Sequence, residues 1–178
     1  NINTAYNSIR NEFNRDLLIK WEEGKTGIPI IDACMRCLNE TGYLNFRMRA
    51  MIVSFAAFNL WQNWKNFSHY LARKFLDYEP GIHYSQIQMQ SAVTGINTVR
   101  IYNPIKNSIL LDPDGKFIKK WVSELKSVPK EYIHEPWKMT KIEQEMYNFS
   151  ILDNYFSPII DIEQSRKNAS EKIWTIRK

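Results

Sequence analysis

Apolar side chains recur every three or four residues along most of the chain, a spacing typical of helices that bury one face. The first such run lies in residues 1–20 and predicts a helix there; its apolar members are Tyr6, Ile9, Phe13 and Leu17. A second run begins at Pro29, where proline opens a helix without losing a hydrogen bond, and extends to about Glu40. Gly42 follows and is expected to end this helix.

The third run extends from about Asn45 to about Trp64 and has apolar residues on all sides. A helix with this pattern is buried all round, so we expect it at the centre of the core. Ser68 is predicted to cap a fourth helix. The apolar residues of that helix are Tyr70, Leu71, Phe75 and Leu76.

The periodicity weakens between Asp77 and Asn107, where prolines and glycines accumulate. These residues are Pro80, Gly81, Gly95 and Pro104. Long irregular segments inside a compact domain are uncommon, and they tend to carry function. We therefore expect a binding loop in this segment.

The second half of the chain returns to helical spacing. A turn at residues 112–115 precedes a predicted helix with apolar residues at 117, 118, 121, 122 and 125. Thr140 and Glu143 form a capping box for a helix that extends to about Leu152, and a partly exposed helix is expected after Pro158. Because no segment alternates with the period of a strand, the predicted fold class is all-α, a helical bundle.

The composition fits one folded domain, since the chain has 178 residues of which 44% are hydrophobic. No apolar run reaches the roughly 20 residues that span a bilayer, so no membrane partner is expected. Cys34 and Cys37 form a C-x-x-C in a helical stretch, without a second ligand pair or a strand-to-helix junction. We interpret them as small buried residues of a protein in the cytoplasm or another reducing intracellular compartment.

The chain is basic, with a net charge of +5 and a pI near 9.1. Such an excess favours a polyanionic partner such as DNA, because binding to phosphates releases counterions. A solvated basic surface is the commoner explanation. Arg100 and Lys106, with nearby asparagines, are candidates for a basic rim around a pocket.

Candidate site residues occur around the third helix and the expected loop. Arg47 and Arg49 point to different faces, so one can meet an internal carboxylate while the other faces a phosphate or solvent; two structural ion pairs are the alternative. Asp77 and Glu79 offer two carboxylates, for which surface charge is the commoner interpretation. His83 is a lone loop histidine of a kind that is usually structural, and three histidines without zinc-ligand spacing predict no metal site.

One segment resembles a known family. Residues 21–36 read WEEGKTGIPIIDACMR, which is similar to the W-x-x-G-x-T-G-x-P-x-x-D-A-x-M-R segment of photolyases and cryptochromes. The similarity continues through TGY at 41–43, RMR at 47–49, RIYNP at 100–104 and HEPW at 134–137. It covers about residues 21–138 in order.

In that family this segment is the C-terminal part of an all-helical domain around a U-shaped FAD, so the resemblance implies FAD as the cofactor. Arg49 and Asp77 resemble the internal ion pair beside the flavin. Tyr78 and Glu79 resemble the strip that borders the isoalloxazine and ribose, although Glu79 stands where aspartate is usual. His83 falls at the position that faces flavin N5, and a histidine with a pKa of about 6.5 would be a proton donor there.

The resemblance also implies a DNA-binding face. Arg47 and Arg100 match residues that contact the DNA backbone. Phe46 stands where photolyases have an asparagine that reaches toward a flipped-out pyrimidine dimer. The predicted DNA-binding residues are Phe46, Arg47, Met89, Arg100 and Lys106.

The electron relay of the family is interrupted in this chain. Trp64 matches the middle relay tryptophan. The usual W-x-W pair reads IQM at 87–89, so the inner relay tryptophan is Ile87. The tryptophan that stacks on the lesion is replaced by Met89, whose soft thioether would still contact a base.

On this resemblance we assign residues 1–138 to the C-terminal part of a FAD-binding helical domain and residues 139–178 to a helical extension of unknown role. The leading hypothesis is a photolyase-type lyase: light-driven electron transfer from FAD that repairs pyrimidine dimers in DNA, damaged or single-stranded. The alternatives are a cryptochrome-like blue-light photoreceptor without repair activity, which Phe46, Ile87 and Met89 favour, and a flavin-free nucleic-acid-binding domain. The family's antenna-binding domain lies upstream of this segment, so we expect an upstream antenna domain or a partner polypeptide.

Overall fold

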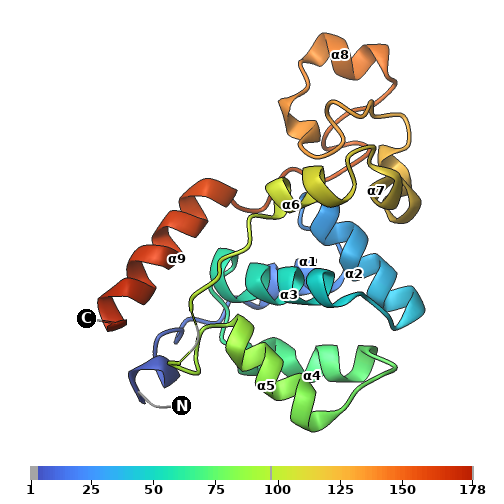
Figure 1. The fold of residues 1–178 in the computed structure, drawn as a ribbon. Helices are drawn as coiled ribbons and strands as arrows, with labels where there is room; N and C mark the ends of the chain where they lie inside the picture. The colour runs from blue at the N-terminus through green and yellow to red at the C-terminus, as the bar shows by residue number, and fades with distance from the viewer. Residues whose placement is uncertain (1–3, 97, 178) are drawn as a thin grey trace.

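A computed structural model describes residues 4–96 and 98–177, and in these ranges the chain is helical, with no strand beyond an isolated bridge (Figure 1). The predicted all-α fold class is confirmed. The α-helices are α1 (Arg15–Glu22), α2 (Pro29–Thr41), α3 (Phe46–Ser54), α4 (Trp64–Lys74), α5 (Pro80–Gln90), α6 (Pro104–Leu111), α7 (Lys116–Trp121), α8 (Lys141–Met146) and α9 (Ile162–Arg177). Short 3₁₀ segments lie at Thr4–Asn7, Ser123–Leu125 and Pro136–Lys138, and α3 continues into a π-helical segment, η2 (Phe55–Asn59).

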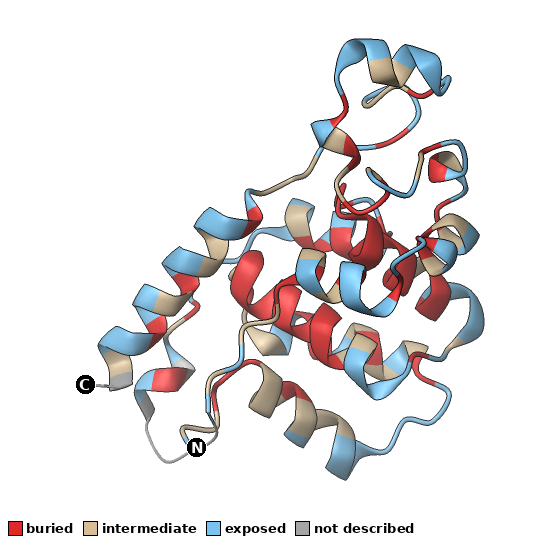
Figure 2. Ribbon diagram, turned by 45° about the horizontal axis from the view of Figure 1, so that its top comes forward, coloured by how far each residue is buried: buried red, intermediate tan, exposed pale blue. Residues whose placement is uncertain are grey.

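The core is built around α2 and the continuous helix α3–η2, the elements that are richest in buried residues (Figure 2). α2 starts with Pro29 at its first position and ends at Gly42, whose φ of 69° is left-handed, so this prediction is confirmed. Helices α1, α3, α6 and α7 all pack against α2. α4 and α5 pack against one another and against the other side of α3–η2.

The predicted third helix ends earlier than expected. It is helical from Phe46 to Asn59, and its last turn widens to a π-helix in which the Leu60 N–H bonds the Phe55 carbonyl at 3.0 Å. Trp61 then has a φ of 54°, which reverses the chain before α4. Nothing in the apolar pattern announces this reversal, because Trp61 itself fits a buried helix.

Two predicted helix starts are wrong, because asparagine side chains cap these helices at other positions. The first twenty residues do not form one helix: α1 begins at Arg15, where the side chain of Asn14 accepts the Leu17 N–H at 3.1 Å. α4 begins at Trp64 and is capped by Asn63. Ser68 lies buried inside α4.

The segment from Asp77 to Asn107 is not an irregular loop throughout, because Pro80–Gln90 form α5. Pro80 takes the first helical position, and the Glu79 carboxylate caps the helix. Apolar residues do not recur at helical spacing in this segment, because Ile87 is the one buried residue of α5 among those that the structure describes. The irregular part is confined to the stretch between α5 and α6.

The second half follows the predictions more closely. α7 begins directly after the predicted turn, and the Asp112 carboxylate accepts the N–H groups of Phe117 and Ile118, both at 3.0 Å. The capping box of Thr140 and Glu143 is present, but its helix ends at Met146 instead of Leu152. The expected helix near the end of the chain is α9.

The residues after 138 share the core of the rest of the chain. The Tyr155 hydroxyl donates to the buried Asp32 carboxylate, and the Ile159 N–H donates to the Thr26 carbonyl at 3.0 Å. α9 packs along η2, whereas α8 lies at the end of the molecule remote from α4 and α5 (Figure 1). Within residues 4–96 and 98–177, no helix has the length and apolar composition needed to cross a bilayer.

Candidate functional site

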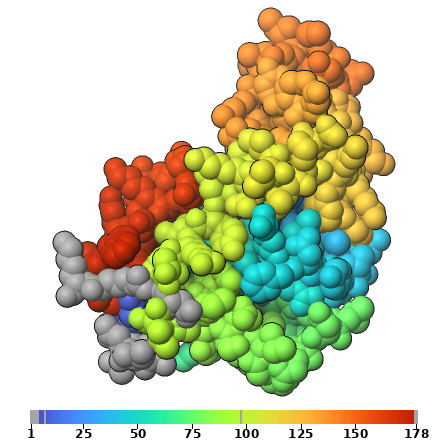
Figure 3. Space-filling view, viewed as in Figure 1, coloured from blue at the N-terminus to red at the C-terminus, as the bar shows by residue number. Residues whose placement is uncertain are grey.

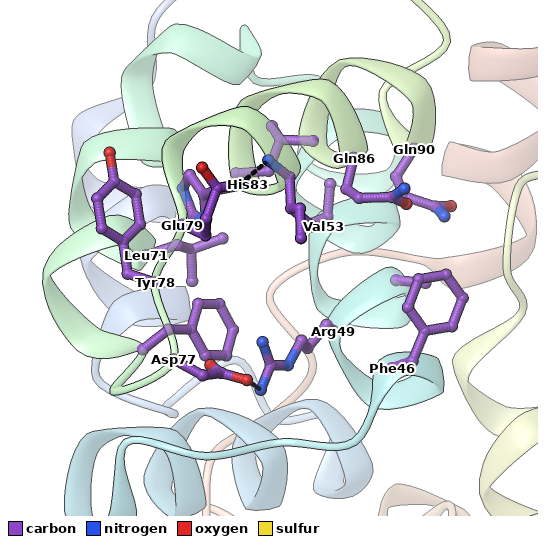
Figure 4. Close-up of a pocket in the computed structure, with 14 residues that line it drawn as sticks. Phe46, Arg49, Val53, Leu71, Asp77, Tyr78, Glu79, His83, Gln86 and Gln90 are labelled. Carbon is purple, nitrogen blue, oxygen red and sulfur yellow. Dashed lines mark hydrogen bonds and ion pairs between the residues drawn. The ribbon is translucent and has the colours of Figure 1, made fainter.

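A cavity of about 170 Å³ lies between α3, α4 and α5 (Figure 4). Its lining combines apolar side chains with an ion pair, a histidine and two amides. The lining residues are Phe46, Arg49, Ala50, Val53, Leu71, Phe75, Asp77, Tyr78, Glu79, Ile82, His83, Gln86, Ile87 and Gln90. Sites for drug-sized ligands measure about 300–1,000 Å³. The cavity is therefore smaller than a site for a ligand of that size.

Arg49 is held at the cavity by a backbone hydrogen bond, an ion pair and aromatic contacts. Its Nε donates to the Leu44 carbonyl at 2.6 Å, and its Nη2 pairs with Oδ2 of Asp77 at 2.9 Å. Its guanidinium also lies over the ring of Phe75, 4.2 Å from the centroid. The hydrogen bond from Arg49 lowers the pKa of Asp77, so the carboxylate stays ionised and the cation keeps its place.

Glu79 has a defined structural role at the edge of the cavity. Its carboxylate accepts the backbone N–H groups of Gly81 at 3.1 Å and Ile82 at 2.7 Å. These are the first free N–H groups of α5, where a negative charge also meets the positive end of the helix dipole. Glu79 therefore sets the direction of α5, which carries the next residues of the site.

One ring nitrogen of His83 forms a hydrogen bond with the backbone of α4. Its Nε2 lies 2.9 Å from the Ser68 carbonyl, which only accepts, so Nε2 carries the proton and donates it. Burial lowers the pKa of His83 below its ordinary value. The ring is neutral at neutral pH with its proton committed to Ser68, which makes it a poorer proton donor than the resemblance implies.

Gln86 and Gln90 are members of the site that the sequence did not reveal. They lie one helical turn apart on α5 and line the cavity opposite Phe46 (Figure 4). The Oε1 of Gln86 is buried and has no hydrogen-bond partner. An unpaired buried carbonyl is costly, so this atom is suited to a ligand that brings a donor. Their four-residue spacing indicates that both glutamines lie on one face, but only once residues 80–90 are known to be helical.

The remaining predicted site residues lie outside the cavity, apart from Phe46, which is 62% exposed at its edge. Arg47, Arg100 and Lys106 are exposed, and Met89 is half-buried on α5. The start of α3, the segment after α5, and α6 adjoin one another on one face of the molecule (Figure 3). Trp64 opens α4 and contacts Tyr84, with ring centroids 6.5 Å apart.

The cysteines and histidines give no sign of a metal or redox centre in the described ranges. Cys34 and Cys37 are both buried as free cysteines. Burial raises the pKa of the Cys34 thiol far above its usual value, so it is unreactive. Their interpretation as buried residues is confirmed. No cluster of three or more His, Cys, Asp or Glu suited to a metal occurs among the residues that the structure describes.

Comparison with known proteins gives a consistent result. The family model described as the FAD binding domain of DNA photolyase matches residues 1–175. A deoxyribodipyrimidine photo-lyase of Alkalihalophilus pseudofirmus is 36% identical over 168 residues, which are 93% of this chain and 35% of that protein. The chain thus spans about a third of the length of the curated relatives that it matches.

Solved structures agree with the sequence comparison. A cryptochrome of Synechocystis sp. superposes with a TM-score of 0.86 at 27% identity, covering 90% of this chain and 33% of that one. An archaeal photolyase of Sulfolobus tokodaii, solved with two FAD molecules, superposes with a TM-score of 0.82 at 34% identity, covering 96% of this chain and 37% of that one.

Proposed function

The chain belongs to the photolyase/cryptochrome family, and on that premise we propose that it forms a flavin site for light-driven electron transfer to damaged DNA. The observation that carries the proposal is the cavity between α3, α4 and α5. It joins an Arg49–Asp77 ion pair to apolar walls and an unpaired acceptor, Oε1 of Gln86.

The donors and surfaces of the cavity fit FAD. A planar heteroaromatic ring needs apolar walls, which Phe75 and Ile82 provide, and a few fixed polar groups. The buried Oε1 of Gln86 lacks a donor, and a ring N–H would satisfy it. We assign Arg49, Asp77, Tyr78, Glu79 and His83 to cofactor binding.

Bound FAD would supply a group that absorbs blue light and exchanges single electrons. The chain's own residues control the charge around it. Arg49 places a permanent cation at the cavity, which favours negative charge there, and Asp77 keeps this cation oriented. The neutral ring of His83 adds no second positive charge, and Phe75 keeps water from the inner side of Arg49.

We propose that the chain binds DNA on the face that carries Arg47, Arg100 and Lys106. These cations are exposed, so they are free to contact phosphates. Phe46 precedes Arg47 and is exposed where it lines the cavity, so its aromatic ring can stack on a base. The upstream part of a longer protein or a partner polypeptide would then complete the cleft.

Repair is tested with an oligonucleotide that carries one pyrimidine dimer, mixed with the chain and reduced FAD under blue light. The proposal predicts loss of the dimer in light and none in the dark. Arg100→Ala should slow repair at subsaturating DNA, because one phosphate contact is lost. Lys141→Ala on the remote helix α8 is the matched control and should leave the rate unchanged. Absence of repair at saturating reduced flavin contradicts the repair function.

A cryptochrome-like photoreceptor is the second candidate, and two observations favour it. Ile87 is buried at the cavity where the family has its inner tryptophan, and Phe46 occupies the position of the asparagine that reaches the lesion. This function predicts light-driven reduction of bound flavin with no loss of dimers. The oligonucleotide experiment therefore separates the two candidates.

A further inference from the structure

A cluster of five rings connects the cavity to the surface of α4. Tyr78 and His83 line the cavity, with ring centroids 5.2 Å apart. His83 contacts Tyr84 at 5.1 Å, and Tyr84 contacts Trp64 at 6.5 Å and His69 at 5.9 Å. All four of these contacts are edge-to-face, the arrangement that aromatic pairs favour. The cluster is a continuous aromatic path that does not pass through Ile87.

Tyr84 is the branch point of this path and has a base within hydrogen-bond distance. Its hydroxyl lies 3.2 Å from Nδ1 of His69. An imidazole nitrogen without a proton accepts from a phenol. His69 is exposed on α4, so a proton that it accepts can pass to solvent. Trp64 has no such partner for its indole N–H among the hydrogen bonds of the described residues.

We propose that Tyr84, with His69 as its proton acceptor, is the redox-active residue that supplies electrons to the cavity and links it to Trp64. The proposal rests on the flavin function proposed above. It assigns Tyr84 the place in the relay that an aromatic residue at position 87 would otherwise take. His69 is a positioning and proton-accepting residue, and His83 and Tyr78 provide the contact with the cavity.

The step balances in electrons and protons. With FAD bound, one electron would leave Tyr84 for the photoexcited, oxidised isoalloxazine, the Tyr84 O–H bond would break, and the proton would move to Nδ1 of His69. The products on the chain would be a neutral tyrosyl and an imidazolium. A soluble thiolate would then return one electron by way of Trp64 while His69 returns the proton, and the two thiolates oxidised in two such turnovers would join as one disulfide.

The surroundings of Tyr84 suit this chemistry. Moving the proton together with the electron avoids a cationic radical, which a half-buried site destabilises. The neighbouring His83 is uncharged because burial lowers its pKa. The hydrogen bond with Tyr84 raises the pKa of Tyr78, so Tyr78 remains a phenol. Tyr147→Phe, directly after the remote helix α8, is the control for Tyr84→Phe, since each change removes one hydroxyl and keeps the ring.

The first arm of the test needs no flavin. The histidine ring nitrogens of the purified chain are observed by ¹⁵N NMR in wild type, Tyr84→Phe and Tyr147→Phe. We expect Nδ1 of His69 to resonate as a hydrogen-bonded acceptor and to shift in Tyr84→Phe but not in Tyr147→Phe. An unchanged His69 resonance in Tyr84→Phe overturns the proposal.

The second arm uses the FAD-loaded chain, after a titration has measured flavin binding by each variant. A blue-light flash followed by EPR should give a tyrosyl signal in wild type and Tyr147→Phe and none in Tyr84→Phe. His69→Ala should slow radical formation roughly 100-fold, the usual contribution of a positioned base, and added imidazole should restore it.

The outcomes separate this proposal from the one on which it rests. A chain that binds no flavin contradicts the proposed function and the relay with it. A chain that binds flavin but keeps its full tyrosyl signal in Tyr84→Phe contradicts the relay alone. Imidazole that fails to rescue His69→Ala removes His69 from the mechanism.

Discussion

At the scale of single residues, the family resemblance located the charged members of the site better than its neutral ones. The resemblance implied an ion pair between Arg49 and Asp77, and the structure contains this pair. Gln86 was not expected, because an amide in a segment taken as irregular carries no signal. The engagement of His83 with Ser68 also depends on how α4 and α5 pack, which no local pattern encodes.

The lowered pKa of His83 predicts an acid-sensitive contribution to stability. In the unfolded chain its pKa is about 6.5, and in the folded chain it is lower. Below about pH 6.5 the unfolded state therefore binds more protons, so the free energy of unfolding falls as the pH falls, with no contribution at higher pH. Urea unfolding of wild type and His83→Gln at about pH 7.5 and about pH 5.5 measures this. The loss on acidification should be smaller in His83→Gln; an equal or larger loss contradicts the assignment.

At the scale of secondary-structure elements, residues that mark helix ends predicted the helices more reliably than the spacing of apolar residues did. α2 was predicted with both ends because Pro29 and Gly42 mark them. α5 was missed because Ile87 is its one buried residue among those described, so it has no apolar stripe. The reversal at Trp61 was missed because its positive φ follows from packing and not from a glycine.

The turn before α2 offers a test of how the chain is held together. Gly27 has a φ of 75°, and a Cβ there would lie 2.3 Å from the Ser157 carbonyl oxygen. Gly27→Ala should lower the free energy of unfolding by about 2 kcal/mol or more, because it combines backbone strain with a clash against backbone. Chemical denaturation of the variant measures the loss.

Gly81→Ala is the matched control for that experiment. A Cβ at Gly81 would meet only the flexible Glu79 carboxylate, at 3.2 Å, and Gly81 lies in a helix where alanine is favoured. Its stability should stay within about 1 kcal/mol of wild type. Equal losses in the two variants would show that the contact between the turn and residue 157 does not support the fold.

At the scale of the whole molecule, the chain is a helical unit with a small cavity. It spans about a third of the length of its curated relatives, and its cavity of about 170 Å³ is smaller than a cofactor-sized site. The resemblance predicted the fold class and the family from motifs in residues 21–138. It did not predict that residues after 138 pack onto the same core through Tyr155 and α9.

The most direct test of the account is a titration of the purified chain with FAD, followed by flavin fluorescence. We expect saturable quenching, weakened about tenfold by Asp77→Ala, because the oriented Arg49 loses its charged partner. Asp114→Ala breaks an exposed ion pair with Lys116 away from the cavity and should bind like wild type. The absence of saturable binding, or equal weakening by both variants, would contradict the assignment of this cavity to flavin.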